Sequence, residues 1–541
     1  MLGFFILYIF ICPKSYILSM NKIIIILLAL LATNSFAALP DSVTNDINSQ
    51  LEKFKTLLEF SYVYHKDSID LEDKSEAALK AYMQALDDKS YYFPEEQYRS
   101  LKESNTGIRK SLGITQIVFA DTSYIFRVDK GSSADTNGVM PGWRILSIDD
   151  INVIKKDELS INEIINDTAL VACNIEFLDL EGKIQNRVLH NSPHVTSSID
   201  ASFMYNDSIA YIKTLKFTED AGNEFEKVIG QFPKSIKGLV IDLENNPGGV
   251  LTAIADVISL FLPEGKQVIK TKSKHPDFYY DVKSKKDGPY IGLPLVLIVN
   301  EETASASELF AGAVQDYDLG IVIGQRTYGK GTLQKHWEFK DGSAFRVTVG
   351  EYVTPLGRKV QKESVKAFDN SAQTLDENLN NQLKNMSIPK DISVVKSTKG
   401  RTLISIGGIM PDSVLNKREA RTKLTEVAIQ KRVLLRTAFE IFISEGKSVL
   451  NMYPDFLSFS RDFFFNSTIS ERIKKNLLIA SLQNDEMFEK DKEIMIGIIK
   501  ARLGQLLFSD EAYYCTEAFE SEEVSKAIIT IKDANNLVRQ E

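Results

Sequence analysis

Apolar and polar positions alternate with different periods along the chain, and these periods divide it into stretches. Residues 41–107 place apolar side chains at near-helical spacing among charged ones, which predicts amphipathic helices. Residues 108–195 change to short β-rich runs separated by glycines such as Gly131 and Gly138, which predicts a small β-rich module. Residues 416–541 interleave charged and apolar positions again and predict further helices.

The stretch between the β-rich module and the C-terminal helices alternates strand-like and helix-like runs. Apolar runs at 238–243, 293–299 and 320–324 predict buried strands, and residues 251–262 and 305–317 predict helices between them. Such alternation implies right-handed crossovers and a mostly parallel core sheet.

These patterns together predict a multidomain α+β fold. We expect a helical N-terminal region at 38–107, the β-rich module at 108–195, an α/β core with a mostly parallel sheet at 196–415 and a helical C-terminal domain at 416–541. The C-terminal domain carries no motif that we can interpret. It would pack on the core or on a second subunit, so a homo-oligomer is one of the states that we consider.

The N-terminus has the pattern of a secretory signal. A lysine at position 22 precedes the apolar run 23–31, and the small residues Ser35 and Ala37 follow. We expect residues 1–37 to be a signal peptide that is cleaved after Ala37, so the mature protein would be exported. The alternative is an uncleaved membrane anchor, which is the one membrane contact that we expect.

Composition narrows the classes of protein that the chain could represent. The 541 residues are 44% hydrophobic and 25% charged, which is typical of globular proteins. The net charge of -9 argues against a nucleic-acid binder, which would normally present a basic face. Cys173 and Cys515 remain beyond the signal, and the sequence does not decide whether they pair. Histidine and cysteine show no metal-ligand spacing, so we expect no metal and no other cofactor.

Three loops follow the three predicted strands, at 244–249, 300–305 and 325–330. Ligands of open parallel sheets bind outside the carboxyl ends of the strands, so we expect these loops at one edge. Two of the loops end in residues with candidate chemistry, Ser305 and Lys330. A serine becomes a nucleophile only when a base takes its proton, and a lysine in an apolar site can be that base.

Each of the two residues also has a plainer interpretation. Ser305 and Glu308 fit a capping box, which is the more frequent meaning of that tetrapeptide, and Ser307 cannot be excluded as the nucleophile by spacing. Lys330 could be an ordinary solvated lysine. As a base it must be neutral, which requires its pKa to fall by roughly three units through burial. On a following strand, Lys330 and Gln334 would share one face.

The motif Asn245-Asn-Pro-Gly-Gly249 follows one predicted strand and precedes a helix. Glycines at such a place let backbone N–H groups point at an anion, as an oxyanion hole requires. The alternative is an ordinary tight turn.

These motifs resemble those of the C-terminal-processing, or tail-specific, serine peptidases. The resemblance covers roughly residues 80–413 and rests on the order and spacing of five motifs. They are Asp242-Leu-Glu-Asn-Asn-Pro-Gly-Gly249, Val299-Asn-Glu-Glu-Thr-Ala-Ser-Ala-Ser-Glu308, Gly324-Gln-Arg-Thr-Tyr-Gly-Lys-Gly331, Thr354-Pro-Leu-Gly-Arg358 and Gly407-Gly-Ile-Met-Pro-Asp412.

The resemblance implies a role for each residue of the candidate site. Ser305 would be the nucleophile, Lys330 the general base and Gln334 the partner of that base. The oxyanion hole would be formed by the backbone of Gly248, Gly249 and Ala306. Two positions depart from the family pattern: Glu244 stands where arginine is usual, and Tyr328 where phenylalanine is common.

The β-rich module resembles a PDZ domain through Gly131-Ser-Ser-Ala134, Gly138-Val-Met-Pro-Gly-Trp143 and Ile145-Leu-Ser-Ile-Asp149. PDZ domains bind a chain's C-terminal carboxylate on loop amides and add the peptide as a strand. The loop Ser111-Leu-Gly-Ile114 is the expected carboxylate site, which makes Leu112, Gly113 and Ile114 the substrate-binding residues.

The expected function is therefore an exported serine endopeptidase, in the bacterial periplasm, with a Ser/Lys dyad. Its partners would be proteins or peptides that are bound by their C-termini. The alternative, motivated by Glu244, is a catalytically impaired peptide-binding scaffold or adaptor.

Overall fold

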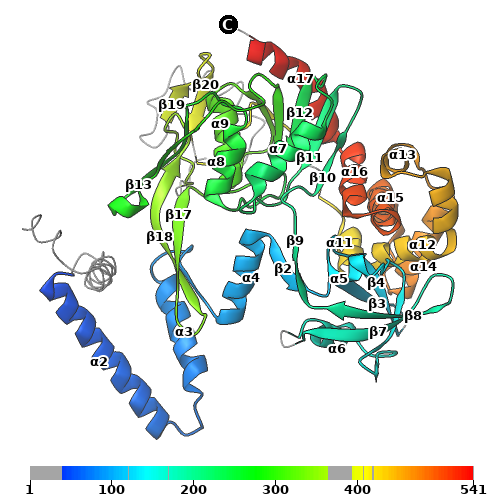
Figure 1. The fold of residues 1–541 in the computed structure, drawn as a ribbon, viewed down its shortest axis with the longest axis horizontal. Coiled ribbons are helices and arrows are strands. Elements are labelled where there is room, and N and C mark those ends of the chain that lie inside the picture. The colour runs from blue at the N-terminus through cyan, green and yellow to red at the C-terminus, as the bar shows by residue number, and fades with distance from the viewer. Residues whose placement is uncertain are drawn as a thin grey trace, which may run out of the picture. The chain divides into compact units, whose positions relative to one another are not determined.

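The computed structural model describes residues 39–119, 121–167, 170–362, 393–405, 407–416 and 420–539. The predicted signal peptide at 1–37 lies outside these described residues. The chain divides into two compact units, Met1–Tyr82 and Met83–Glu541 (Figure 1). In the described part of the chain, no helix combines the length and the hydropathy that crossing a membrane requires.

The described part of the first unit is helical, as the spacing of its apolar residues predicts. It contains α2 (Asp41–Tyr64) and most of α3 (Leu71–Gln84). No residue of α2 is buried. Apolar side chains of this helix, among them Leu51 and Leu57, are therefore exposed.

The predicted β-rich stretch forms an antiparallel sheet of order β3-β4-β5-β7-β8, in which β6 pairs with β5. Its strands are β3 (Ile114–Phe119), β4 (Thr122–Val128), β5 (Arg144–Ile148), β6 (Ile151–Asn152), β7 (Ala172–Leu178) and β8 (Ile184–His190). The short helices α5 (Ser133–Thr136) and α6 (Glu158–Ile165) accompany it. A separate pair, β2 (Ile108–Ser111) with β9 (Ser192–Val195), joins the two ends of the stretch. The core contains Ile125, Ile145 and Phe177.

The central sheet has the order β10-β11-β12-β15-β16-β21. Its strands are β10 (Ala201–Met204), β11 (Ile209–Lys213), β12 (Gly238–Asp242), β15 (Leu295–Val299), β16 (Gly320–Gly324) and β21 (Ser413–Val414). The pairs from β11 to β21 are parallel, but β10 pairs with β11 in the antiparallel sense. The sheet is therefore mixed, because the four residues between β10 and β11 can close a hairpin but cannot form a parallel crossover.

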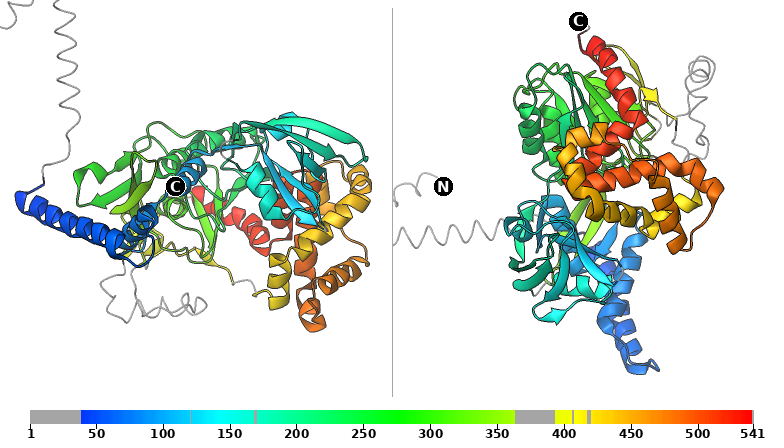
Figure 2. Two further views of the ribbon diagram at one scale, coloured as in Figure 1. Left: turned by 90° about the horizontal axis from the view of Figure 1, so that it is seen from below. Right: turned by 90° about the vertical axis from the view of Figure 1, so that its right-hand side faces the viewer.

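Helices cover both faces of the central sheet. Alternate strand residues such as Leu239 and Leu297 pack against α7 (Ala221–Gln231), α8 (Leu251–Ser259) and α9 (Ala306–Asp316). The residues between them, such as Val240, Val296 and Ile298, point to the opposite face and pack against α17 (Glu522–Arg539). Figure 2 shows α17, drawn in red, against the green strands of this sheet. The last helix of the chain thus completes the core.

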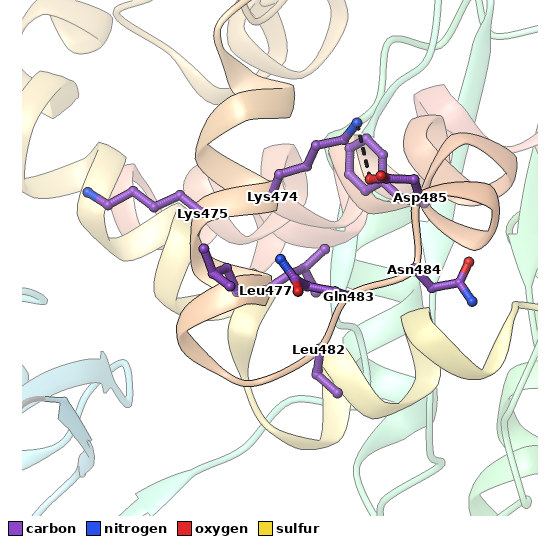
Figure 3. A pocket seen from close by; sticks show the side chains of 9 residues that line it. Lys474, Lys475, Leu477, Leu482, Gln483, Asn484 and Asp485 are labelled. Atoms are coloured by element: carbon purple, nitrogen blue, oxygen red, sulfur yellow. Dashed lines mark ion pairs between the residues drawn. The ribbon is translucent and has the colours of Figure 1, made fainter.

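The other C-terminal helices form a bundle with its own apolar core. They are α11 (Lys423–Gln430), α12 (Val433–Met452), α13 (Phe456–Asp462), α14 (Ile469–Ile479), α15 (Asp485–Leu507) and α16 (Asp510–Glu520). The bundle packs on the β-rich module, where the Phe439 ring lies 4.8 Å from the Tyr124 ring, centroid to centroid. A pocket opens at the turn between α14 and α15, where Lys474 Nζ lies 3.7 Å from Asp485 Oδ1 (Figure 3).

A second sheet extends from the core in the order β1-β18-β13-β14, and β17 pairs with β18. Its strands are β1 (Tyr91–Phe93), β13 (Gln267–Ser273), β14 (Asp281–Lys283), β17 (Thr332–Glu338) and β18 (Ala344–Val353). The 3-10 helix η1 (Pro276–Phe278) lies between β13 and β14, α4 (Glu95–Thr106) follows β1, and β19 (Ser393–Lys396) pairs with β20 (Thr402–Ser405). Because β17 begins two residues after Lys330, this sheet positions the end of the lysine loop.

The structure answers the question about the cysteines. Cys173 and Cys515 are both free and buried, and they belong to different apolar cores. They do not pair.

Candidate active site

The three loops predicted to converge are hydrogen-bonded to one another at the carboxyl ends of β12, β15 and β16. The Thr303 hydroxyl donates to the carbonyl of Leu243 at 2.8 Å. The Asn245 N–H donates to Asn300 Oδ1 at 3.0 Å. The Tyr328 N–H reaches the Thr303 carbonyl, also at 3.0 Å. Residues far apart in the sequence therefore share one edge of the sheet.

Ser305 occupies the turn that enters α9. Its backbone angles, φ 57° and ψ -119°, lie outside the regions that non-glycine residues ordinarily adopt. Ser305 and Glu308 form the capping box that the sequence suggested, in which the Ser305 N–H donates to Glu308 Oε2 at 2.8 Å. The capping interpretation is thus right, and it leaves Ser305 partly exposed at the sheet edge.

Ser307 lies in a different environment from Ser305. It is completely buried, and its hydroxyl has no hydrogen-bond partner among the described residues. Of the two serines that spacing could not separate, only Ser305 is accessible to a substrate.

Glu308 joins the serine turn to the lysine loop. Its Oε1 accepts the Thr327 hydroxyl at 2.6 Å and the Gly329 N–H at 2.7 Å. Its Oε2 accepts the N–H groups of Ser305 and Lys330, each at 2.8 Å. Burial raises the pKa of Glu308 to about 7, although these hydrogen bonds oppose the rise. The sequence identified Glu308 only as a helix cap, because hydrogen bonds to residues 19 to 22 positions away leave no local signal.

Lys330 is partly buried, and burial lowers the pKa of its amine to about 8. The positive charges of Arg346 and Lys89 lower this pKa further, whereas Glu308 raises it. Lys89 and Arg346 come from distant segments, and the Arg346 Nε donates to the Lys89 carbonyl at 2.9 Å. Neither residue could be identified from the sequence, because their approach depends on how β1 pairs with β18.

Tyr352, in β18, contacts the same loop. Its hydroxyl donates to the carbonyl of Lys330. Burial, assisted by Glu308, raises the pKa of Tyr352 well above its usual value, and a hydrogen bond with the Ser305 side chain opposes the rise. Tyr352 therefore lies between the two candidate residues.

Gln334 has a different partner from the expected one. Its Nε2 donates to the Thr332 hydroxyl at 2.6 Å. The ladder of β17 and β18 shifts register between Leu333 and Gln334, and such a bulge changes where side chains point along a strand.

The glycine turn after β12 lies directly against the Ser305 backbone. An ideal Cβ placed on Gly248 would lie 2.8 Å from the nitrogen of Ala306, so only glycine fits there. The Gly248 N–H donates to Asn246 Oδ1 at 2.8 Å, so this donor is engaged. Among the residues that the structure describes, we find no acceptor for the N–H groups of Gly249 and Ala306.

The predicted carboxylate loop connects β2 to β3. Leu112 is completely buried. Gly113 has a φ of 83°, and an ideal Cβ there would lie 2.0 Å from the Ser132 side chain. Its N–H donates to the Ser111 hydroxyl at 3.1 Å. Ile114 opens β3, an edge strand of the β-rich module.

Comparison with known proteins adds independent information. Residues 208–367 match the family model described as Peptidase family S41. The carboxyl-terminal-processing protease of Picosynechococcus sp. is 30% identical over 304 residues, which are 55% of this chain and 73% of that protein. The carboxyl-terminal-processing protease of Synechocystis sp. is 31% identical over 280 residues, which are 49% of this chain and 64% of that protein.

A solved structure titled photosystem II D1 C-terminal processing protease aligns with 57% of this chain and 83% of its own chain. The identity is 20% and the TM-score is 0.32. The match to the Synechocystis sp. protease spans slightly less than two thirds of that relative's length. The extent of the Picosynechococcus sp. match is sufficient to show the family: this chain belongs to peptidase family S41.

Proposed function

We propose that this protein is a serine endopeptidase in which Ser305 is the nucleophile and Lys330 is the general base. The observation that carries the proposal is the shared carboxylate oxygen of Glu308, which accepts the backbone N–H groups of both residues. A single buried atom thereby ties the serine turn to the lysine loop. The lowered pKa of Lys330, about 8, supports the role of base, because about a tenth of the amine is then neutral at pH 7.

In the proposed reaction, the neutral Lys330 amine takes the proton of the Ser305 hydroxyl as Ser305 Oγ attacks the substrate carbonyl. The tetrahedral intermediate then expels the amine of the leaving peptide, which receives the proton from Lys330. An acyl-enzyme remains on Ser305. Lys330 next takes a proton from water, which attacks the ester, and the returned proton restores the Ser305 hydroxyl.

The negative oxygen of the intermediate would be stabilised by backbone N–H groups. We assign this role to Ala306 and to the Gly248-Gly249 turn, because α9 begins at Ala306 and the turn packs against it. Gln334 is proposed to orient the Lys330 amine. Because its amide donates to Thr332 in this structure, that role requires its side chain to turn toward Lys330.

Substrate recognition is assigned to the β-rich module at 108–195, which we propose to be a PDZ domain. The backbone of Leu112, Gly113 and Ile114 would bind the C-terminal carboxylate of a protein, and the peptide would add to the edge of β3. We further propose that residues 1–37 direct export and that the enzyme acts in the bacterial periplasm.

One observation favours the alternative of a catalytically impaired peptide-binding scaffold. The Gly248 N–H is engaged by Asn246, so it could join the oxyanion hole only after that hydrogen bond breaks. The two proposals are separated by incubating an unstructured protein such as casein with the wild-type chain, a Ser305→Ala variant and a Ser307→Ala control. The peptidase proposal expects cleavage by the wild type and the control but none by Ser305→Ala. If the wild type cleaves nothing, the scaffold is favoured. If Ser305→Ala cleaves as fast as the wild type, Ser305 is not the nucleophile and the peptidase proposal fails.

A further inference from the structure

A buried ion pair lies at the base of the glycine turn. Lys213 is the last residue of β11 and Asp242 is the last residue of β12, and the two residues are direct partners in the parallel ladder. Lys213 Nζ lies 2.9 Å from Asp242 Oδ1, and the Tyr211 hydroxyl donates to Asp242 Oδ2 at 2.7 Å. The side chains of Lys213 and Asp242 are only 8% and 6% exposed. Each charge therefore depends on the other, because water is excluded from both.

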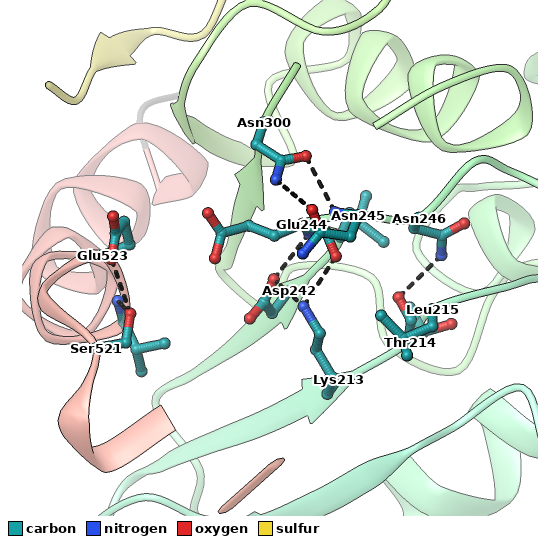
Figure 4. A network of polar contacts seen from close by, with 12 residues as sticks. Lys213, Thr214, Leu215, Asp242, Glu244, Asn245, Asn246, Asn300, Ser521 and Glu523 are labelled. Atoms are coloured by element: carbon teal, nitrogen blue, oxygen red, sulfur yellow. Dashed lines mark hydrogen bonds and ion pairs between the residues drawn. The ribbon is translucent and has the colours of Figure 1, made fainter. Parts of the chain in front are cut away.

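The same pair holds the first residue of the turn. The Lys213 ammonium donates to the carbonyl of Glu244 at 3.0 Å, and Asp242 Oδ1 accepts the Glu244 N–H at 2.9 Å. Figure 4 shows the Lys213 and Asp242 side chains meeting beneath Glu244. Both backbone polar groups of Glu244 are thus bound by one ion pair. The turn itself, residues 244–249, contains no basic residue, so Lys213 supplies this positive charge from outside the turn.

From this anchor the contacts continue to the nucleophile through Asn246. Its Nδ2 donates at 2.9 Å to the carbonyl of Thr214, the residue after Lys213. The backbone carbonyl of Asn246 accepts the N–H of Ala304 at 3.0 Å, and Ala304 directly precedes Ser305. The end of β11 is therefore hydrogen-bonded to the turn at two places, through the Lys213 side chain and through the Thr214 backbone carbonyl.

We propose that Lys213 is a positioning residue, which holds the Gly248-Gly249 turn in place so that the Gly249 N–H, which has no acceptor among the described residues, points at the developing oxyanion. This inference rests on the proposed function, since the oxyanion belongs to that reaction. Lys213 itself does not contact the substrate. Donors that stabilise charge only in the transition state affect kcat rather than KM, so a misplaced turn should lower kcat selectively.

The test compares three variants with the wild-type chain. Lys213→Met alone would leave the Asp242 carboxylate buried without its partner, so Lys213→Met is combined with Asp242→Asn. The single carbonyl oxygen of the asparagine still accepts the Glu244 N–H, and its NH₂ group can donate to the Tyr211 hydroxyl oxygen. Lys213→Arg retains the charge. Lys237→Met changes an exposed lysine just before the start of β12. We expect kcat on casein to fall about tenfold or more in the double variant, with KM within about twofold of the wild type. Lys213→Arg should recover most of the kcat, and Lys237→Met should match the wild type.

Hydrogen exchange of the segment 244–250, followed by mass spectrometry, separates this inference from the proposed function. It should become faster in the double variant and remain at the wild-type rate in Lys237→Met. If the wild type cleaves no protein, the proposed function fails, and the exchange rate alone still decides whether Lys213 holds the turn. The inference would be overturned if the exchange rate of the double variant were unchanged, or if only its KM rose while its kcat stayed at the wild-type value. It would also be overturned if Lys213→Arg were as slow as the double variant.

Discussion

Glu308 Oε2 accepts the backbone N–H of Lys330 at 2.8 Å, across 22 positions of sequence. The same oxygen accepts the Ser305 N–H, so the position of the nucleophile and that of the base depend on one side chain. A helix cap that ordinarily satisfies only its own first turn here also organises a loop after another strand. Among the residues that the structure describes, the donors to Glu308 are uncharged backbone N–H groups and one hydroxyl. A carboxylate suits this buried position because its two oxygens accept all four of these hydrogen bonds.

The first prediction concerns the replacement Glu308→Gln. A glutamine offers one acceptor oxygen, and its NH₂ group would face N–H groups that are themselves donors. We expect at least one buried donor to lose its partner, at a cost of about 1–3 kcal/mol of unfolding free energy, and proteolysis to become undetectable. Urea unfolding and casein cleavage measure the two effects. Glu302→Gln, at an exposed position in the loop that precedes α9, should change neither the unfolding free energy nor the rate of cleavage.

The second prediction concerns the dependence of activity on pH. Lys330 must be neutral to act, so kcat/KM should rise with pH and level off above the pKa of about 8. Arg346→Gln removes a positive charge that lowers this pKa, so the rising limb should move to higher pH. Arg187→Gln, in the β-rich module, should leave the profile unchanged. A limb that moves to lower pH in Arg346→Gln would contradict the assigned base.

The sequence predicts the elements around the site better than the contacts within it. The strands before the three loops are apolar runs, and the start of α9 follows from the Ser305 to Glu308 spacing, so both could be predicted. That the Gly248 N–H donates to Asn246 was not predicted, although asparagine side chains commonly bind the backbone N–H two residues on. The pairing of Lys213 with Asp242 depends on the register of β11 and β12, which is not specified by strands that are buried on both faces.

Two features of the fold also exceeded what the sequence could indicate. The mixed character of the central sheet comes from β10, a four-residue strand too short to show a period of its own. The third layer of the core comes from α17, which the charged and apolar pattern identifies as a helix without saying what it covers. Long-range packing of this kind is decided by complementary shapes, which periodicity does not encode.

The third prediction concerns Lys330→Arg. Arginine keeps the positive charge but does not lose its proton in proteins, so it cannot act as a base. Proteolysis should fall below detection, whereas the midpoint of thermal unfolding should stay close to that of the wild type, because the side chain is partly exposed. Lys335→Arg, at an exposed position of β17, is the matched control and should be fully active. Measurable turnover in Lys330→Arg would exclude the proposed mechanism.

The last prediction concerns α17 and the peptidase core. Ile531 is 4% exposed and lies so close to β12 that an ideal Cβ on Gly238 would be 2.6 Å from its side chain. Ile531→Ala should therefore open a cavity against the central sheet and lower the free energy of unfolding by about 2–5 kcal/mol. Ile529, on the same helix, is 70% exposed, so Ile529→Ala should have almost no effect. Urea unfolding followed by fluorescence measures both. If α17 did not belong to the core, Ile531→Ala would leave the urea unfolding transition unchanged. Equal stability of the Ile531→Ala and Ile529→Ala variants would therefore contradict the place of α17 in the core.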